Sequence, residues 1–427
     1  MERMLTVELE IAKRAEKFTE SGMTNLHQFM DVELLREIMS GMNKKSSTGI
    51  DGQGWTNYCI EHQEDLYDLL SEFKTGQYKA PPVRRVYIPK DKHSQRPLGI
   101  PTVRDKILQG GVRALIEPIY EKIFKDFSYG YRQGKTIHQA LGYLFRQVSF
   151  GKMPYIIDAD IQNFFGSIDF GQMREFLAHR VNDGIVRKMI DKWMKAGVFE
   201  DGEISYPEMG TPQGGSISPL LSNIYLHYVL DEWFVEEIQP RLKGKSFMVR
   251  FADDFVIGFS NMEDAKKVME VLPKRFGRYN LKLHPEKTKL LDMESEPVRG
   301  NRSFDFLGFT HYKGKSLKGF PILKRKTSKK KFTKSMTKIT DWIKKNRHMK
   351  LSKMIDAINI RLRGHYNYYG ITFNSRGINR YFREVSKVLL KWINRRGGKK
   401  AWNWERYRLL ISQWKILLKP RIYHSFV

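Results

Sequence analysis

Apolar residues recur along this chain with two spacings, one typical of helices and the other typical of strands. A spacing of three or four residues predicts helices over 1–40, 55–75, 103–127, 138–148, 170–181, 220–234 and 262–279. Runs rich in β-branched and aromatic residues predict strands at 83–88, 155–161, 247–250, 255–259, 281–283 and 304–309. Because strands alternate with helices and most can pair as hairpins, we expect an α+β domain with an antiparallel sheet backed by helices.

The C-terminal part carries a different pattern. Residues 321–331 resemble a Lys- and Arg-rich linker, and three apolar stripes at helical spacing follow, over 336–343, 351–362 and 378–392. The stripes predict a shared core, and the charged residues fall on the opposite faces. We therefore expect a small basic helical bundle.

An acidic pair, Asp253 and Asp254, separates two apolar strands and is expected at or near the tip of a hairpin. Asp-Asp is not a favoured hairpin turn, and adjacent carboxylates repel each other. A divalent cation with oxygen ligands would remove that cost. A solvated turn would show the same pattern, so the metal interpretation needs further carboxylates. Asp160, at the end of strand 155–161, is the candidate, since that strand is expected in the same sheet.

Two other stretches suggest contacts with phosphates. Gly210–Pro219 is a glycine-rich loop before a helix, in which Ser216 or Ser218 is expected to be the N-cap and Pro219 to lie in the first turn. Its spacing matches neither a P-loop nor a dinucleotide-binding motif. A basic strand pair over 83–100 could clamp a triphosphate or a template backbone, although a solvated basic hairpin would look the same.

Charge narrows the choice of partner. The net charge is +28, and residues 324–427 alone carry 29 Lys and Arg against four acidic residues, a net of +25. Charge this concentrated, with aromatic residues interleaved, favours nucleic acid over a membrane surface. No apolar run is long enough to span a membrane, no secretory signal is visible, and a lone Cys59 excludes an intrachain disulfide. We expect a cytoplasmic protein.

Seven stretches, in this order, closely resemble motifs of bacterial group II intron-encoded reverse transcriptases, also called maturases. They are Arg96–Thr102, Tyr129–Arg132, Asp160–Phe165, Thr211–Gly215, Phe251–Asp254, Lys287–Lys289 and Phe306–Phe309. A further stretch, Arg363–Gly370, looks like the thumb of that family. Each motif is weak alone, but the shared order and spacing make the resemblance specific.

The resemblance implies a right-hand polymerase. It divides the chain into an N-terminal extension and fingers (1–150), a palm with finger elements (151–320), an all-α basic thumb or maturase X domain (321–400) and a basic aromatic tail (401–427). Nothing beyond the thumb resembles the family's His-Asn-His endonuclease, so an endonuclease-less form is expected.

The same resemblance implies roles for individual residues. The catalytic residues would be Asp160, Asp253 and Asp254, and the palm metal ions would be held by Asp160, Ile161, Asp253 and Asp254. The incoming dNTP would contact Lys90, Arg96, Phe165, Gln213 and Lys287, with Phe165 excluding a 2′-hydroxyl. The primer grip would be Leu307, Gly308 and Phe309. Candidate nucleic-acid contacts are Arg84, Arg85, Arg132, Lys329, Lys330, Lys331, Arg361, Arg363, His365, Arg395 and Arg396. The family usually has Tyr at the position of Phe251 and Asp at that of Gly166, and only the second change removes an acid.

The expected activity is RNA-directed DNA polymerisation with two Mg²⁺ ions, which Mn²⁺ could replace. Its partners would be an RNA template (a group II intron or another structured RNA), a DNA or RNA primer and dNTPs, with a homodimer compatible with the sequence. Binding to intron RNA would also assist splicing. Two alternatives stay open: a domesticated enzyme in antiphage defence, and a protein that acts mainly as an RNA-binding splicing chaperone.

Overall fold

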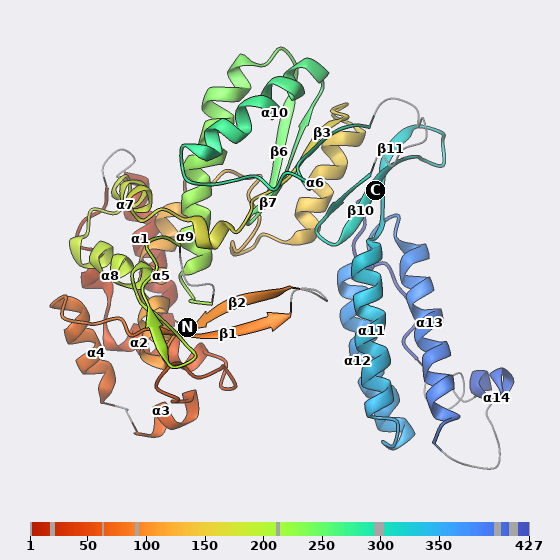
Figure 1. The fold of residues 1–427 in the computed structure, drawn as a ribbon, viewed down its shortest axis with the longest axis horizontal. Coiled ribbons are helices and arrows are strands. Elements are labelled where there is room, and N and C mark those ends of the chain that lie inside the picture. The colour runs from red at the N-terminus through yellow and green to blue at the C-terminus, as the bar shows by residue number, and fades with distance from the viewer. Residues whose placement is uncertain are drawn as a thin grey trace. The chain divides into compact units, whose positions relative to one another are not determined.

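The helix and strand patterns of the sequence are realised in a computed structural model (Figure 1). It describes residues 2–17, 22–61, 64–89, 94–210, 214–293, 303–396, 403–409 and 417–426. The chain divides into two compact units. The first comprises Met1–Thr136, Ile157–Ile257 and Glu263–Leu290, and the second comprises Ile137–Ile156, Gly258–Met262 and Leu291–Val427.

The helices of the first unit gather around α5 (Val103–Glu121), whose residues are largely buried because apolar side chains occupy most of its circumference. The Thr102 hydroxyl caps α5 by accepting a hydrogen bond from the Asp105 amide. Helices α1 and α2 pack against α5. The other helices are α1 (Glu2–Lys17), η1 (Leu26–Phe29), α2 (Val32–Gly41), α3 (Trp55–Glu61), α4 (Asp65–Lys74), η2 (Phe164–Ser167), α7 (Phe170–Ala178), α8 (Gly184–Met194), α9 (Ser218–Leu226), the π-helical η3 (His227–Ile238), η4 (Gln239–Arg241) and α10 (Met262–Gly277).

One sheet of the first unit has the order β2-β1-β4-β5. Its strands are β1 (Val83–Pro89), β2 (Gln95–Ile100), β4 (Val198–Glu200) and β5 (Glu203–Ser205). The predicted basic strand pair is confirmed: β1 and β2 run antiparallel, with Arg84 opposite Ile100 and Ile88 opposite Arg96.

The central sheet has the order β6-β7-β3-β8. Its strands are β6 (Ser246–Phe251), β7 (Asp254–Phe259), β3 (Tyr155–Asp160) and β8 (Lys289–Asp292). All residues of β7 after Asp254 are buried, as expected for a continuous apolar run in the middle of a sheet. The predicted hairpin is confirmed, and β3 lies directly beside β7, so the strand that ends in Asp160 shares a sheet with the acidic pair.

The second unit combines a three-stranded sheet with helices. The sheet has the order β11-β10-β9. Its strands are β9 (Ser303–Phe306), β10 (Phe309–Lys315) and β11 (Pro321–Thr327). The helices of this unit are α6 (Ile137–Ser149), α11 (Lys329–Lys345), α12 (Leu351–Tyr369), α13 (Ser375–Ile393) and α14 (Trp404–Leu409). The three predicted helices are confirmed as α11, α12 and α13, and α13 packs against both of the others.

Several expectations about local structure were wrong. The strand predicted at 281–283 does not form, since Leu283 makes only an isolated bridge to Ile161, and the strand predicted at 304–309 is two strands, β9 and β10, joined by a turn. Residues 321–331 are not a linker, because β11 pairs with β10 along its whole length and buries Ile322, Leu323 and Arg325. Neither Ser216 nor Ser218 is the N-cap of α9, since Ile217 holds the cap position and the helix starts at Ser218. Pro219 does lie in the first turn, as predicted.

The α+β architecture with a helical C-terminal region agrees with the predicted fold class. The four predicted segments with boundaries at 150, 320 and 400 stay a prediction. Among the described helices none is long and apolar enough to cross a membrane.

Candidate active site

The turn that carries the acidic pair is held by close contact with a glycine. Only Ala252 and Asp253 separate β6 from β7, and Ala252 adopts a left-handed backbone with φ 58°. A β-carbon on Gly130 would lie 2.2 Å from the Ala252 amide nitrogen, so only glycine fits there. The Tyr129 amide donates to the Arg250 carbonyl at 2.8 Å, which keeps this loop against the turn.

A buried polar network supports the same turn from behind. The Arg250 guanidinium forms a two-pronged ion pair with the Asp231 carboxylate of η3, with N···O distances of 2.8 and 2.5 Å. It also donates to the Asn223 side chain and to the Ala252 carbonyl, at 2.9 and 3.1 Å. The Asn223 amide in turn donates to the Gly130 carbonyl at 2.7 Å. Because these groups are fully buried, each needs its partners, and the network fixes where the turn lies.

Asp160 reaches the acidic pair from the end of β3. The Asp160 carbonyl accepts a hydrogen bond from the His284 amide at 2.8 Å, and the Gln162 amide donates one to the Lys282 carbonyl at the same distance. This pairing places the following turn so that Lys287 Nζ lies 2.5 Å from Asp160 Oδ2. The cation and the carboxylate both remain accessible to solvent.

The charges of the three aspartates are coupled. Although Asp254 reaches solvent, surrounding protein desolvates its carboxyl and raises its pKa, and the negative charges of Asp253 and Asp160 raise the pKa further. A hydrogen bond between the Asp254 and Asp160 carboxyl groups also raises the pKa of Asp254, while the Lys287 cation lowers it. The structure thus brings Asp160, Asp254 and Lys287 together, with Asp253 next to them in the turn.

The described residues contain no group of three or more His, Cys, Asp or Glu side chains arranged to hold a metal ion. The three aspartates therefore do not form a preassembled cage. They do form a site in which burial, together with the negative charges of Asp253 and Asp160, raises the pKa of Asp254.

Tyr131 faces this site and was missed as a functional residue. Burial raises the pKa of its phenol, and among nearby charges Asp253 raises the pKa while Arg96 lowers it. Tyr131 also has a left-handed φ of 60°, an uncommon conformation for a bulky residue. The sequence feature that could have pointed to Tyr131 was its place in the Tyr129–Arg132 motif. Arg96 is exposed on β2 and lies close enough to Tyr131 to affect its pKa. Arg96 is therefore near the aspartates as well.

Part of the predicted nucleotide site lies outside the described residues, namely Lys90 and Gln213. Next to the latter, Gly214 has φ 130°, and a β-carbon on it would lie 2.4 Å from the Gly99 carbonyl. Gly214 thus permits a close approach to the chain's own β2. Its presence is not evidence for a bound phosphate.

Two further residues of the palm motif lie just beyond β3. Ile161 is buried and bridges to Leu283. Phe165 is half-buried in η2, where its ring packs edge-on against Phe164 at a centroid distance of 5.6 Å. The Phe165 ring is therefore held by packing while part of it stays accessible.

The predicted primer grip is a tight turn between β9 and β10. Leu307 and Gly308 both have positive φ, 50° and 81°, which matches a type I′ hairpin turn. The Tyr368 hydroxyl donates to the Leu307 carbonyl at 3.0 Å, and Phe309 stacks on the Tyr368 ring at 6.0 Å. These contacts attach the turn to α12 within the second unit.

The candidate nucleic-acid contacts need two corrections. Arg132 is buried and donates to Glu121 and to the Lys125 and Ser128 carbonyls, so its cation serves the loop and not a ligand. His365 is buried and stacked on Tyr381 at 3.6 Å, and burial lowers its pKa to about 4, which leaves it uncharged at neutral pH.

Other candidates have partners within the chain. Arg84 donates to the Thr48 carbonyl at 2.6 Å, and Arg85 lies 3.7 Å from Glu200. Arg361 stacks on the Trp342 ring at 3.9 Å, and Arg396, half-buried, contacts the Met354 sulfur. The exposed candidates are Lys329, Lys330, Lys331, Arg361, Arg363 and Arg395.

A basic stripe on α13 was missed. Its five exposed cations recur every three or four residues and so share one face of the helix. They are Arg376, Arg380, Arg383, Lys387 and Lys391. The spacing was available in the sequence, but the apolar stripe of the same helix dominates the pattern there.

Comparison with known proteins identifies the class. Residues 88–311 match the family described as reverse transcriptase (RNA-dependent DNA polymerase). That match covers more than half of the chain, so the chain belongs to the reverse transcriptase family and is an RNA-directed DNA polymerase. Residues 332–410 match the group II intron, maturase-specific domain, which makes it a group II intron reverse transcriptase with a splicing maturase role. Enzymes of this family generally use divalent metal ions, and both domains imply nucleic-acid partners such as intron RNA.

Relatives agree with this assignment. The chain is 28% identical to the group II intron-encoded protein LtrA of Lactococcus lactis subsp. cremoris, over 90% of this chain and 76% of LtrA. It is 31% identical to protein YkfC of Escherichia coli (strain K12), over 61% of this chain and 74% of YkfC. A putative COX1/OXI3 intron 1 protein of Saccharomyces cerevisiae is 27% identical, over 64% and 38% of the two chains. The resemblance drawn from the motifs is confirmed.

Proposed function

We propose that this chain extends a primer 3′-hydroxyl with dNTPs copied from an RNA template, using Asp160, Asp253 and Asp254 as its catalytic residues. The observation that carries the proposal is the meeting of Asp160, Asp254 and Lys287 beside the Ala252–Asp253 turn. Phosphoryl transfer requires placement and charge neutralisation more than covalent chemistry, so a partly solvated carboxylate site suits it.

The donor set fits divalent cations. Carboxylate oxygens are the ligands that Mg²⁺ prefers. Burial and repulsion by Asp253 and Asp160 raise the pKa of Asp254, and a bound cation would stabilise the charged form that they disfavour. Asp160, Ile161, Asp253 and Asp254 would hold two Mg²⁺ ions, or Mn²⁺. When bound, the ions would supply charge stabilisation for the attacking and leaving oxygens.

The remaining residues would position the substrates. Lys287, which balances Asp160 in this structure, would become free to contact the triphosphate once the carboxylates have another cation. Arg96, Lys90 and Gln213 would also contact the nucleotide. Phe165, with its ring fixed by Phe164, would leave no room for a 2′-hydroxyl.

The basic surface would hold the template and primer. We propose that the exposed lysines at the start of α11, together with Arg361, Arg363, Arg395 and the α13 stripe, contact phosphates. The Leu307–Phe309 turn would hold the primer strand. Intron RNA would bind the same surfaces when the protein assists splicing.

Primer extension on an RNA template tests the site. Asp253→Ala should reduce dNTP addition to background while RNA affinity changes little, because one carboxylate is a small part of the binding surface. Glu203→Ala, an exposed acid on β5, is the matched control and should behave as the unmodified protein. Supplying NTPs in place of dNTPs checks the role of Phe165. Sustained dNTP addition by Asp253→Ala would refute the assignment of the site.

A further inference from the structure

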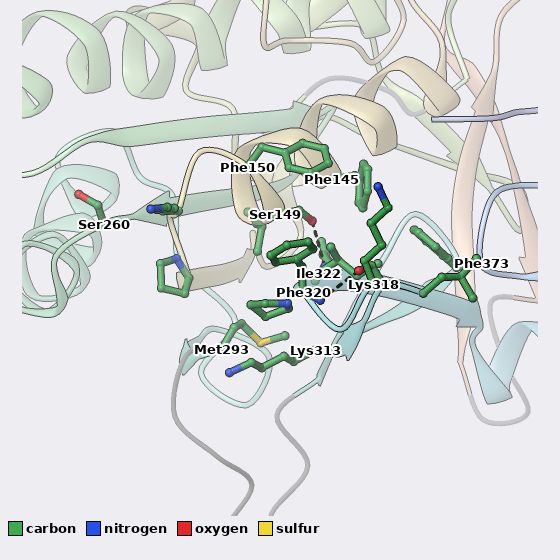
Figure 2. A pocket seen from close by; sticks show the side chains of 17 residues that line it. Phe145, Ser149, Phe150, Ser260, Met293, Lys313, Lys318, Phe320, Ile322 and Phe373 are labelled. Atoms are coloured by element: carbon green, nitrogen blue, oxygen red, sulfur yellow. Dashed lines mark hydrogen bonds between the residues drawn. The ribbon is translucent and has the colours of Figure 1, made fainter. Parts of the chain in front are cut away.

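The second unit contains a hollow of about 950 Å³ that no role assigned above uses (Figure 2). Residues from the end of α6, from the segment 150–154 and from the β10–β11 hairpin line it. This volume lies in the usual range for ligand sites in proteins. Its wall is mainly apolar, and aromatic rings are prominent in it, as Figure 2 shows for Phe145, Phe150 and Phe320.

Two of these rings are unusually exposed. Phe150 and Phe320 each keep 65% of their surface accessible. Scattered apolar side chains on a surface are ordinary, but two phenylalanine rings on one hollow form a patch that favours a partner. One ring follows α6 and the other precedes β11, so segments distant in the sequence assemble the hollow.

Local contacts hold the Phe150 ring and the backbone of Phe320 in place. The Phe150 ring meets Phe145 edge-on at 5.5 Å. The Ser316 amide donates to the Phe320 carbonyl at 2.8 Å, and the Phe320 amide donates to the Ser316 hydroxyl at 3.0 Å, which closes the hairpin tip. The Leu323 amide donates to the Ser149 hydroxyl at 3.0 Å and ties that hairpin to α6. The Phe150 ring and the hairpin tip that carries Phe320 are therefore preorganised, which lowers the entropy cost of binding.

Charge selects the class of occupant. Lys152, Lys313 and Lys318 line the hollow with exposed side chains, whereas no described residue of the lining carries a carboxylate. Lys152 and Lys318 form no ion pair within the described part of the chain. The complementary ligand combines flat apolar surface with negative charge. An unpaired nucleotide has both, since its base can stack on a ring while its phosphate meets a lysine. A duplex hides its base faces and a peptide seldom combines the two properties.

We propose that this hollow binds one or two unpaired nucleotides of the RNA on which the enzyme acts, through stacking on Phe150 and Phe320 and phosphate contacts with the three lysines. The inference rests on the proposed function, since it assumes a nucleic-acid substrate. It adds a site for single-stranded RNA that is built by other residues than the aspartates, the primer grip and the α13 stripe.

The test compares RNA duplexes with and without a single-stranded extension, by fluorescence anisotropy with the full-length protein. Phe150→Ala with Phe320→Ala should reduce the preference for the extended duplex about ten-fold or more per stacked base. Phe320→Trp should retain the preference, because an indole also stacks. Tyr206→Ala removes an equally exposed ring elsewhere and is the matched control.

A second arm tests the charges. Lys152→Ala with Lys318→Ala should weaken binding of the extended duplex and flatten its salt dependence, whereas Lys315→Ala, an exposed lysine on β10 outside the lining, should not. Thermal unfolding of every variant confirms that these exposed positions leave the fold intact.

An unchanged preference in the double phenylalanine variant, or a photo-crosslink at the hollow from an acidic peptide but none from a thiouridine-labelled extension, would overturn the proposal. Primer extension on an RNA template with a recessed primer 3′ end separates the two hypotheses. If the unmodified protein and the phenylalanine variants all extend the primer, a loss of the preference for the extended duplex concerns only the hollow. If the unmodified protein extends nothing, the proposed polymerase activity fails independently.

Discussion

At the scale of single residues, the site depends on side chains that never touch a substrate. Asp231 and Arg250 are buried together behind the turn, and Asn223 links them to the Gly130 carbonyl. A buried pair of this kind is often no more stable than apolar replacements, but removal of one partner leaves an uncompensated charge. We infer that the network is kept for position more than for stability.

Asp231→Ala should therefore lower the free energy of unfolding by about 3–5 kcal/mol, because Arg250 loses its carboxylate. Combining Asp231→Leu with Arg250→Met should recover much of that loss without restoring the hydrogen bond to the Ala252 carbonyl. Urea unfolding and primer extension, measured on the same samples, check both statements. A stable double variant with full polymerase activity would show that the network has no positioning role.

A second buried acid makes stability depend on pH. Asp105 accepts hydrogen bonds from Trp193 at 2.8 Å and Tyr78 at 3.0 Å, yet burial raises its pKa to about 6. Between its ordinary pKa and 6, the folded protein keeps a proton that the unfolded chain releases, so this contribution to stability falls as pH rises.

Asp105→Asn keeps the acceptor oxygen and cannot ionise. The unmodified protein should lose roughly 3 kcal/mol relative to this variant between about pH 4 and pH 7. Denaturant titrations of both proteins at several pH values provide the measurement. Parallel stability curves for the two would contradict the raised pKa of Asp105.

At the scale of elements, α11 begins in a way that local electrostatics disfavours. Its first three residues are Lys329, Lys330 and Lys331, at the end of the helix where the dipole prefers negative charge, and Ser328 makes no side-chain cap. The Leu307–Gly308 turn, the predicted primer grip, lies against this start, since the Ser328 amide donates to the Gly308 carbonyl at 3.1 Å. A cost in helix stability is thus retained where we propose that RNA phosphates bind.

Replacing the three lysines by Gln should raise the free energy of unfolding by about 1 kcal/mol and weaken RNA binding. The matched control lies on the same helix: Lys344→Gln with Lys345→Gln removes cations at the end where the dipole favours them, so stability should fall. Chemical denaturation and RNA titration measure the two effects. If the first variant is both less stable and equally tight in RNA binding, the interpretation of α11 is wrong.

At the scale of the whole molecule, charge is divided very unequally along the chain. Of the net +28, residues 324–427 carry +25. Within that segment apolar stripes bury the helices against each other, so the cations are left on outer faces such as the α13 stripe. Affinity for RNA should therefore come mainly from this segment and depend strongly on salt.

Arg376→Gln, Arg383→Gln and Lys391→Gln together should flatten the slope of log K against log salt by about 0.7–0.9 for each phosphate that the variant no longer neutralises. Lys266→Gln with Lys267→Gln, exposed on α10, serves as the control and should leave the slope unchanged. Titrations with RNA between about 50 and 200 mM salt give both slopes. Equal slopes for the two variants would remove α13 from the nucleic-acid surface.

The sequence by itself determined the class of protein, the three C-terminal helices and the acidic hairpin, because apolar periodicity and motif order are local properties that survive without coordinates. It could not show that Arg132 and His365 turn inward, or that the lysine-rich stretch over 321–327 is a buried strand. Those outcomes depend on packing against other elements, namely on contacts with Glu121, Tyr381 and β10. Only the tertiary structure decided that Lys287 balances Asp160 and that Arg250 and Asp231 hold the turn. Burial and charge pairing arise from contacts between distant segments, and no local pattern encodes them.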